Sequence, residues 1–447
     1  MKSSEYKYLR FVRFKGLLQW DLKRYLNKTF KSKYDIVNLG IHIKEESNKY
    51  TISEPGKKYG ILGVNNQTGI FDAYWEDGSK IKQKYKKMET GWIAYNPYRV
   101  NVGSIGIKKP EHKNEYMSPA YVVFSCQPSL DPDYLFLTMK TPTFNKIIRD
   151  NTTGSVRQNL SFDTLTGLPI PTPTFPEQKA LIKAYNERIK QAQDLEEQAS
   201  QIEKEIEEYL LTELNISITK AKLHKGLNLV RFKDVERWDI PFFVSNTKAS
   251  SKYDTVKMAT CIDKFMLDNN DQSLRTETYK YPTNTYHYIG MDSIEKNSGT
   301  LLDLPTVKGS DIKSQTVSVP IEYFIYGKLR PYLNKYWFND TKETDIVCSS
   351  EFFVFSIKDS INKLFFKYLL SSSLVQSQLS DAVSGARMPR INESIFKNLL
   401  LPIPPRSIQD GIAEHINKLK ERIVQLKQQS EDLREKALEE FEKEIFK

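Results

Sequence analysis

The side chains best suited to chemistry are arginines, lysines and amides that stand beside aromatic residues in two parts of the chain. Arginine makes a two-pronged contact with guanine, and Asn or Gln does the same with adenine, so these types in loops suit nucleic-acid recognition. The candidates in the first part are Arg99, Arg157, Gln158 and Asn159. Those in the second part are Lys328, Arg330, Tyr332, Arg387 and Arg390.

The residue types of common enzyme centres form no pattern. Cys126, Cys261 and Cys348 are scattered, the five histidines are dispersed, and no Cys or His spacing predicts a zinc site. The chain has neither a GxxxxGK[ST] phosphate loop nor a GxGxxG loop after a strand. Asn96-Pro97-Tyr98 is similar to the Asn-Pro-Pro-Tyr loop of amino-methyltransferases, but it lacks the second proline. We therefore expect no catalytic residue, cofactor or metal in this chain.

Bulk properties favour a multidomain protein. A chain of 447 residues exceeds one ordinary core, and no apolar run approaches the ~20 residues of a membrane-spanning helix. No secretory signal is visible, and the cysteine usage fits a reducing compartment, so we expect a cytoplasmic protein.

The elements that must position the candidate residues occur twice. Val12-Arg-Phe-Lys15 and Trp20-Asp21 return 218 residues later as Val230-Arg-Phe-Lys233 and Trp238-Asp239, and we expect them to be structural. Ser32-Lys-Tyr-Asp35 returns as Ser251-Lys-Tyr-Asp254. Repeats of this length indicate a tandem duplication.

Later segments extend the repeat at larger offsets. Tyr95 to Arg99 matches Tyr326 to Arg330 at an offset of 231. Two further pairs match at 233: Arg157 to Ser161 with Arg390 to Ser394, and Leu168-Pro-Ile-Pro171 with Leu401-Pro-Ile-Pro404. Gln178 then matches Gln409. The alignment at 233 pairs Asn159 with Asn392 and sets Gln158 against Ile391.

Each copy predicts a mixed globular region of about 160 residues. Tyr121–Phe124 and Glu351–Phe355 indicate strands, and 361–379 indicates a helical stretch. Asp77-Gly78 predicts a hairpin turn. We expect the Leu-Pro-Ile-Pro segments to stop regular structure, because proline lacks a backbone N–H.

A long helix is predicted after each globular region. Apolar residues recur at steps of 3 and 4 from Glu177 and again from Ile408, on otherwise charged sequence. A narrow apolar seam must be covered by a partner of similar length, and the other copy's helix is the obvious one, in parallel or antiparallel. Pairing between two chains is the alternative. The expected seam residues are Leu195, Ile202, Ile206, Leu419, Ile423, Leu426 and Leu433.

Positive charge is concentrated outside these helices. The whole chain carries +10, but residues 177–214 carry −5 and residues 408–447 carry −2, so the remainder carries +17. A strongly basic globular region beside acidic rods is the electrostatic footprint expected for phosphate binding. A generally lysine-rich surface is the alternative explanation.

The order of elements resembles the specificity (S) subunit of type I restriction–modification enzymes. Lys328–Leu333, Ser349–Phe352 and the loop ending at Arg390–Ser394 look like stretches of its target recognition domains. The resemblance implies a mixed α/β (α+β) fold with two similar recognition domains and two long helices forming an intramolecular coiled coil, in pseudo-two-fold order. It assigns 1–170 and 227–403 to the domains, and 171–226 and 404–447 to the helical spacers.

The same resemblance implies a non-enzymatic subunit that reads a bipartite double-stranded DNA target. Its expected partners are two methyltransferase (M) subunits and, through them, restriction (R) subunits. S-adenosylmethionine, ATP and Mg are then expected on the partners. The alternatives are a fused methyltransferase or nuclease with its own recognition domains, and a coiled-coil scaffold that binds no nucleic acid.

Two hypotheses about mechanism follow from the duplication. The helices act as a ruler, so changing 177–214 by whole turns changes the spacer between half-sites and leaves the half-sites alone. Residues shared by both copies, such as Arg99/Arg330 and Asn159/Asn392, are expected to clamp phosphate or to hold the fold. Base readers are expected among residues that differ, such as Gln158 and Ile391.

Overall fold

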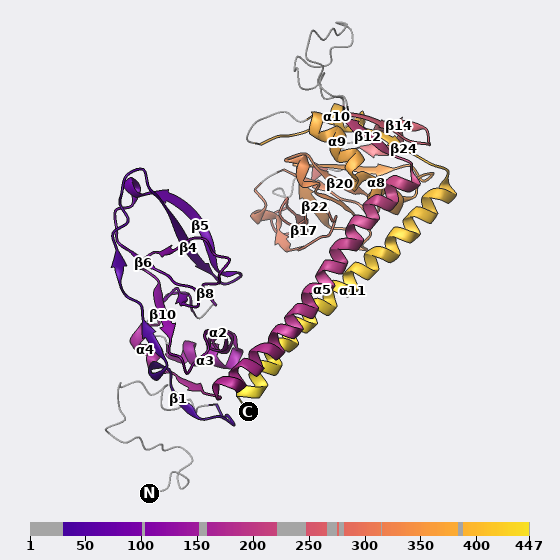
Figure 1. Cartoon of the computed structure of the whole chain (residues 1–447). Helices are drawn as coiled ribbons and strands as arrows, with labels where there is room; N and C mark the ends of the chain where they lie inside the picture. Colours follow the sequence, from indigo (N-terminus) through magenta and orange to yellow (C-terminus); the bar gives the residue numbers. More distant parts are fainter. Residues whose placement is uncertain are drawn as a thin grey trace. The chain divides into compact units, whose positions relative to one another are not determined.

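The computed structural model describes residues 30–100, 103–151, 159–220, 247–265, 275–276, 281–313, 315–382 and 388–446. They divide into two compact units, unit 1 (Met1–Glu196 with Lys427–Lys447) and unit 2 (Glu197–Leu426). Each unit contains one mixed globular region, here called head 1 and head 2, and parts of both long helices (Figure 1). The repeated Arg-Phe and Trp-Asp pairs near residues 13–21 and 231–239 lie outside the described residues.

Head 1 is built, in its described part, from two sheets and a short strand pair (Figure 1). The larger sheet has the order β3-β6-β9-β4-β5, with β4 and β9 parallel. Its strands are β3 (Lys49–Tyr50), β4 (Lys58–Asn65), β5 (Gly69–Asp77), β6 (Tyr85–Lys87) and β9 (Tyr116–Met117). The smaller sheet, β2-β10-β7-β8, contains β2 (Ile43–Glu45), β7 (Ile93–Tyr95), β8 (Ile105–Ile107) and β10 (Val122–Cys126).

Head 2 repeats this plan strand for strand. Its larger sheet has the order β16-β19-β22-β17-β18, with β17 and β22 parallel, and its smaller sheet the order β15-β23-β20-β21. The larger sheet contains β16 (Arg275–Thr276), β17 (Thr285–Ile289), β18 (Thr306–Lys308), β19 (Thr316–Ser318) and β22 (Ile346–Ser349). The smaller contains β15 (Ile262–Phe265), β20 (Phe324–Gly327), β21 (Tyr336–Phe338) and β23 (Phe352–Ile357). The predicted duplication, including the strands at 121–124 and 351–355, is confirmed.

Short helices close each head in the same order. In head 1 they are α2 (Pro132–Lys140), α3 (Pro142–Asn151) and α4 (Phe162–Thr166). In head 2 they are α8 (Lys363–Ser371), α9 (Ser373–Ala382) and α10 (Glu393–Lys397). The helical stretch predicted at 361–379 is therefore α8 and most of α9, separated at Ser372.

The Leu-Pro-Ile-Pro segments do not stop regular structure, contrary to expectation. Pro169–Pro171 forms β11, which pairs antiparallel with β1 (Ile36–Asn38), and Leu400–Pro402 forms β24, which pairs with β14 (Thr255–Lys257). Asp35 and Leu39 make ladder hydrogen bonds to Thr172 and Leu168. Bonded and non-bonded pairs alternate in an antiparallel ladder, so Pro169 and Pro171 occupy positions that need no N–H.

The 233-residue alignment predicted for these segments is wrong, because the structure repeats at 231. Leu39 N donates to Leu168 O, and the equivalent Met258 N donates to Leu399 O, not to Leu401. The proline pattern has period two, so a shift of two residues keeps every proline at a non-bonded position. The identical residues of the two Leu-Pro-Ile-Pro segments therefore do not occupy equivalent positions in the structure.

The same offset applies at the start of α4 and α10. Ser161 Oγ accepts from Thr164 N, and Asn392 Oδ1 accepts from Ile395 N, so these two residues are the equivalent N-caps. Ser and Asn both cap helices well, although their letters differ. Asn159 is therefore equivalent to Arg390, and the predicted pairing of Asn159 with Asn392 is corrected.

Asp77-Gly78 is not a hairpin turn. The Asp77 carboxylate accepts from Ser79 N at 2.9 Å and caps the short 3-10 helix η3 (Gly78–Lys80). A Cβ on Gly78 would lie 2.2 Å from the backbone O of Glu54, so only glycine fits this close approach. The hairpin instead joins β4 and β5, where Asn65 Oδ1 accepts from Gln67 N and Thr68 N.

The two long helices are α5 (Phe175–Glu213, 39 residues) and α11 (Arg406–Ile445, 40 residues). At ~1.5 Å per residue each is about 60 Å long. Within unit 1 the start of α5 pairs with the end of α11, since Arg188 bonds Glu440 and Glu196 bonds Arg434. Within unit 2 the end of α5 pairs with the start of α11, where the rings of Tyr209 and His415 lie 4.2 Å apart. The helices are therefore antiparallel partners within one chain (Figure 1).

A polar contact at the seam of unit 1 specifies how these helices align. Ser430 is 1% exposed, and its Oγ donates to Glu196 Oε1 at 2.7 Å. Arg434 donates to both oxygens of Glu196, at 3.1 and 3.0 Å. These bonds hold the pKa of Glu196 below its ordinary value. A polar group buried in a coiled-coil seam favours the one alignment that satisfies it.

Each head is bound to the start of its own helix by an identical glutamine. Gln178 Oε1 accepts from Asp131 N, and Gln409 Oε1 accepts from Asn362 N, both at 2.7 Å. Their Nε2 atoms donate to Pro173 O and Pro404 O. Both side chains are buried, so each amide satisfies backbone groups that water cannot reach.

Each head is also bound to the end of the other copy's helix. In unit 1 the Glu442 carboxylate of α11 accepts from Thr143 N in the first turn of α3. In unit 2 the Glu207 carboxylate of α5 accepts from Ser373 N and Oγ at the start of α9. Carboxylates are favourable at helix N-termini because they satisfy unpaired N–H groups.

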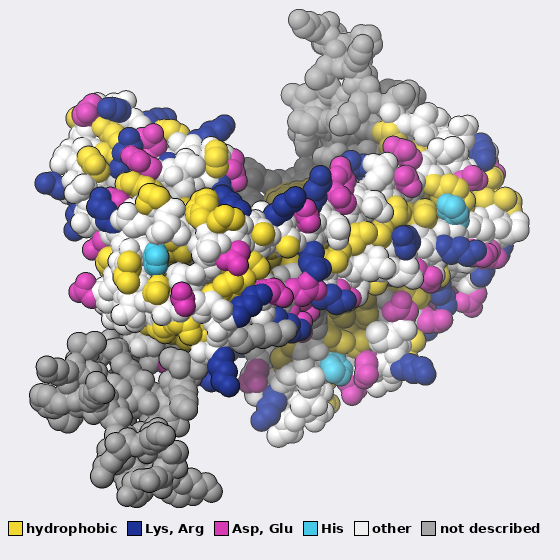
Figure 2. Space-filling model, turned by 60° about the horizontal axis from the view of Figure 1, so that its bottom comes forward, with side chains coloured by type: hydrophobic (Ala, Val, Ile, Leu, Met, Phe, Trp, Pro, Cys, Tyr) yellow, Lys and Arg dark blue, Asp and Glu magenta, His cyan; other side chains and the backbone are white. Residues whose placement is uncertain are grey.

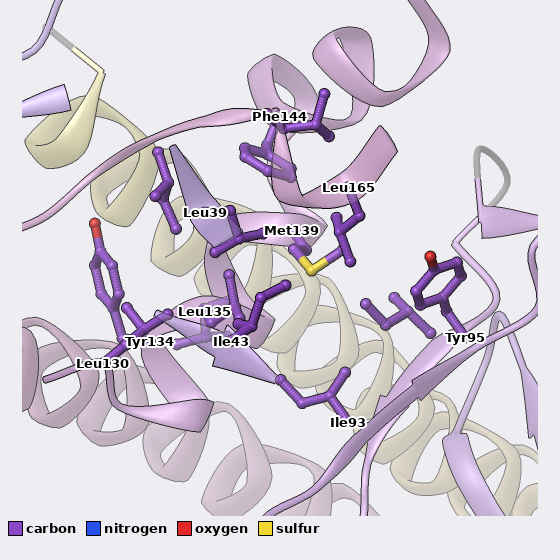
Figure 3. Packing of buried hydrophobic residues seen from close by; sticks show 14 of the residues in the cluster. Leu39, Ile43, Ile93, Tyr95, Leu130, Tyr134, Leu135, Met139, Phe144 and Leu165 are labelled. Atoms are coloured by element: carbon purple, nitrogen blue, oxygen red, sulfur yellow. The ribbon is translucent and has the colours of Figure 1, made fainter. Parts of the chain in front are cut away.

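The core of unit 1 includes the end of α11. Figure 3 shows Leu39, Tyr134, Met139, Phe144 and other residues of this cluster packing together. Phe441 and Ile445 of α11 belong to the same cluster, and the Phe441 ring lies 5.8 Å from that of Tyr134. Residues about 300 positions apart in the chain therefore share one core.

Candidate nucleic-acid interface

In head 2 the predicted residues meet around the loop that follows β20. This Arg330 loop comprises residues 327–335. Arg330 N donates to Pro389 O, Leu329 forms a β-bridge with Arg390, and Ile391 N donates to Lys328 O. The segment 388–391 therefore lies along the Arg330 loop and brings Lys328, Arg330 and Arg390 together. Arg387 lies outside the described residues.

Arg330 is the exposed cation of this loop. Its φ of 49° is left-handed, which is uncommon for a residue with a side chain and costs of order 1–3 kcal/mol. Within the described part of the chain, its guanidinium makes no hydrogen bond or ion pair. Tyr332, two residues on, is 59% exposed. An exposed arginine and tyrosine on one strained loop form a surface suited to a nucleic-acid backbone.

The ammonium group of Lys328 already contacts other groups of the protein. Its Nζ donates to Ser350 O at 2.7 Å and lies 5.1 Å from the ring centre of Phe353. Its backbone N–H donates to Glu351 O. Lys328 therefore helps to hold the loop against the start of β23.

Arg390 forms a two-pronged ion pair with Glu351. Arg390 Nε donates to Oε2 at 3.1 Å, and Nη2 donates to Oε1 at 2.9 Å. These bonds raise the pKa of Arg390 above its ordinary value. Glu351 lies within the stretch Ser349–Phe352, but no pattern in the sequence marked its carboxylate as the partner of an arginine 39 residues away.

Head 1 has an equivalent but simpler loop, the Arg99 loop, comprising residues 96–100 and 103–104. Leu160 N donates to Pro97 O, and the Tyr95 hydroxyl donates to Leu160 O at 3.1 Å. Arg99 is exposed and its guanidinium has no partner within the described residues. Tyr98 is 56% exposed. Arg99 and Arg330 thus occupy the same position in the two heads.

Asn159 lies beside the Arg99 loop but is directed inward. The residue is half-buried, and its Oδ1 is buried without a hydrogen-bond partner among the described residues. An acceptor without exposed surface cannot receive the N6 amino group of adenine. Arg157 and Gln158 lie outside the described residues.

The exposed charged side chains are of both signs. On the face drawn in Figure 2, Lys and Arg side chains are interspersed with Asp and Glu. The excess of +17 outside the helices is therefore not gathered into one patch on that face. Individual loop arginines, rather than a broad basic field, are the best candidates for contacts with nucleic acid.

Thiol and metal chemistry find no support in the described residues. Burial raises the pKa of the Cys126 thiol to about 12 and that of Cys261 to about 11, and it also raises that of Cys348. All three thiols are therefore protonated near neutral pH. The described part of the chain contains no group of three or more His, Cys, Asp or Glu placed to hold a metal. No described helix is long and apolar enough to cross a membrane.

The predicted seam residues lie on the paired helices with unequal burial. Ile206, Ile423 and Leu426 are buried, whereas Leu195, Ile202, Leu419 and Leu433 are half-buried. Three small side chains at positions of the same helical pattern are fully covered: Ala192 and Ala199 on α5 and Ser430 on α11.

Comparisons with known proteins agree with this architecture. Residues 264–434, which include most of head 2 and the first part of α11, match the family described as type I restriction modification DNA specificity domain. The chain is 24% identical over 332 residues to the type I restriction enzyme EcoDI specificity subunit of Escherichia coli, covering 71% of this chain and 68% of that protein. Most of head 2 is therefore similar in sequence to a type I DNA specificity domain, and 71% of the chain is similar to a specificity subunit.

A chain from a solved structure of a type I R-M system shares the fold. A chain from the structure titled "Structural basis underlying complex assembly and conformational transition of the type I R-M system" superposes with a TM-score of 0.52 at 12% identity, covering 94% of this chain and 99% of that one. The HsdS subunit of Thermoanaerobacter tengcongensis gives a TM-score of 0.41 at 12% identity, with coverages of 92% and 96%. The first of these chains therefore shares the mixed α/β fold of this protein.

Proposed function

We propose that this chain is a specificity subunit that reads a bipartite duplex DNA target, one half-site per head, and carries two methyltransferase subunits on its paired helices. In this proposal residues 1–170 and 227–403 are the recognition domains, and 171–226 and 404–447 are the spacers. The chain itself catalyses nothing. S-adenosylmethionine, ATP and Mg belong to the methyltransferase and restriction subunits.

One observation carries the proposal: two heads of the same fold each present an exposed arginine at the same loop position. Arg99 and Arg330 both stand four residues after a buried tyrosine in a strand of the smaller sheet, Tyr95 in β7 and Tyr326 in β20. Residues common to both heads cannot distinguish two different half-sites. They suit the phosphate backbone, which is the same at both.

Arg99→Ala and Arg330→Ala should weaken DNA binding by similar factors on every sequence. Each phosphate contact releases about one counterion, so each substitution should lower the slope of log K against log salt by about 1, and the double variant by about 2. The measurement is fluorescence anisotropy of the full chain with mixed-sequence duplex DNA between 50 and 200 mM salt. Arg422→Ala, an exposed arginine on α11, is the matched control. Slopes equal to that of the control would rule out both arginines as phosphate contacts.

A further inference from the structure

The corrected alignment places Arg390 among the residues that differ between the heads. Its equivalent in head 1 is Asn159, and the equivalent of its partner Glu351 is Ala120. Head 1 therefore has neither the guanidinium nor the carboxylate of this pair. A side-chain pair present in only one of two otherwise similar heads is the kind of feature that makes two half-sites differ.

The geometry of the pair leaves part of the guanidinium available. Arginine has five N–H donors, and Glu351 accepts one from Nε and one from Nη2. Three donors remain, two on Nη1 and one on Nη2, and the Arg390 side chain is 49% exposed. The Nη1 and Nη2 edge forms the fork that fits the O6 and N7 acceptors of guanine.

Backbone contacts fix the two partners on either side of the Arg330 loop. Lys328 N donates to Glu351 O at 2.8 Å, and Lys328 O accepts from Ile391 N at 3.1 Å. Glu351 and Arg390 therefore lie on segments bonded to the same residue. The carboxylate also makes the pair neutral overall and repels phosphate, whereas Arg330 carries an uncompensated charge. Arg390 is therefore suited to a base, and Arg330 is suited to the phosphate backbone.

We propose that Arg390, held by Glu351 as a positioning residue, reads one guanine in the half-site bound by head 2. The inference rests on the proposed function. Head 1 reads its half-site without such a pair.

Arg390→Lys and Glu351→Gln test this proposal. Lysine keeps the charge but loses the fork, so Arg390→Lys should reduce preference for guanine at one position on the order of 10- to 100-fold, with the salt slope unchanged. Glu351→Gln should reduce preference at the same position by a smaller factor and should not weaken binding to mixed sequence. The measurement is sequencing of duplexes selected from a random library by the full chain.

Matched controls are Arg406→Lys and Asp410→Asn, which alter another exposed pair in unit 2, bonded at 2.8 Å. These should leave every base frequency unchanged. Loss of preference in both half-sites, or lower thermal stability with unchanged base frequencies, would reduce the pair to a structural role and overturn the inference. A wild-type chain that selects no sequence would instead contradict the proposed function.

Discussion

Lengthening both long helices by four residues at facing positions should lengthen the spacer of the DNA target by about two base pairs and leave both half-sites unchanged. The facing positions follow from the pairs Glu196–Ser430 and Tyr209–His415: between Gln201 and Ile202 in α5, and between Val424 and Gln425 in α11. Four residues add ~6 Å of helix, and one base pair spans ~3.4 Å. They also complete about 1.1 turns, so the seam stays on nearly the same face.

The same insertion in α5 alone tests the hypothesis with a single change. It should also change the spacer and leave both half-sites unchanged, because four residues add about one whole turn of helix. The measurement is methylome sequencing of cells that express each variant with the methyltransferase of the system. An unchanged spacer in the doubly extended protein, or altered bases in either half-site, would contradict the ruler hypothesis.

Phe441→Ala should destabilise unit 1 by about 3–5 kcal/mol, which is typical for removing a buried aromatic ring. Phe441 is 4% exposed and packs against Tyr134 and Tyr185, whose ring centres lie 5.8 and 6.3 Å away. The loss of stability should affect head 1, although Phe441 lies near the C-terminal end of α11. Chemical denaturation measures the free energy of unfolding, with Val424→Ala, 67% exposed on the same helix, as the control.

Hydrogen exchange tests the same prediction helix by helix. Amides of α2 and α3 in Phe441→Ala should exchange faster than in wild type, while those of α8 and α9 should not change. Faster exchange confined to head 2, or a free energy of unfolding equal to that of the control, would show that the end of α11 does not support head 1.

The repeated heads and the long helices could be predicted from the sequence because both leave periodic signals. Apolar steps of 3 and 4 define α5 and α11, and repeated tetrapeptides reveal two copies. The direction of helix pairing could not be predicted, because an apolar seam has the same period in parallel and antiparallel pairs. Contacts between the helices, such as Arg188 with Glu440 and Tyr209 with His415, determine the direction within each unit.

The candidate site was predicted less well, for a physical reason. The Leu-Pro-Ile-Pro letters suggested an offset of 233, but helix caps and ladder hydrogen bonds repeat at 231. Ser161 and Asn392 both cap a helix, although their side chains differ. The prolines, in contrast, remain at non-bonded ladder positions after a shift of two residues. The offset of 233 therefore assigned Asn159 and Arg390 the wrong equivalents in the other head.

In the proposed function, one duplicated chain presents two DNA-reading heads and paired helices that fix the spacer. The most direct test is the methylome of cells that express the wild-type chain with the methyltransferase of the system. We expect one motif made of two different short half-sites separated by a non-specific spacer of fixed length. A single contiguous motif, or two half-sites at variable separation, would contradict it.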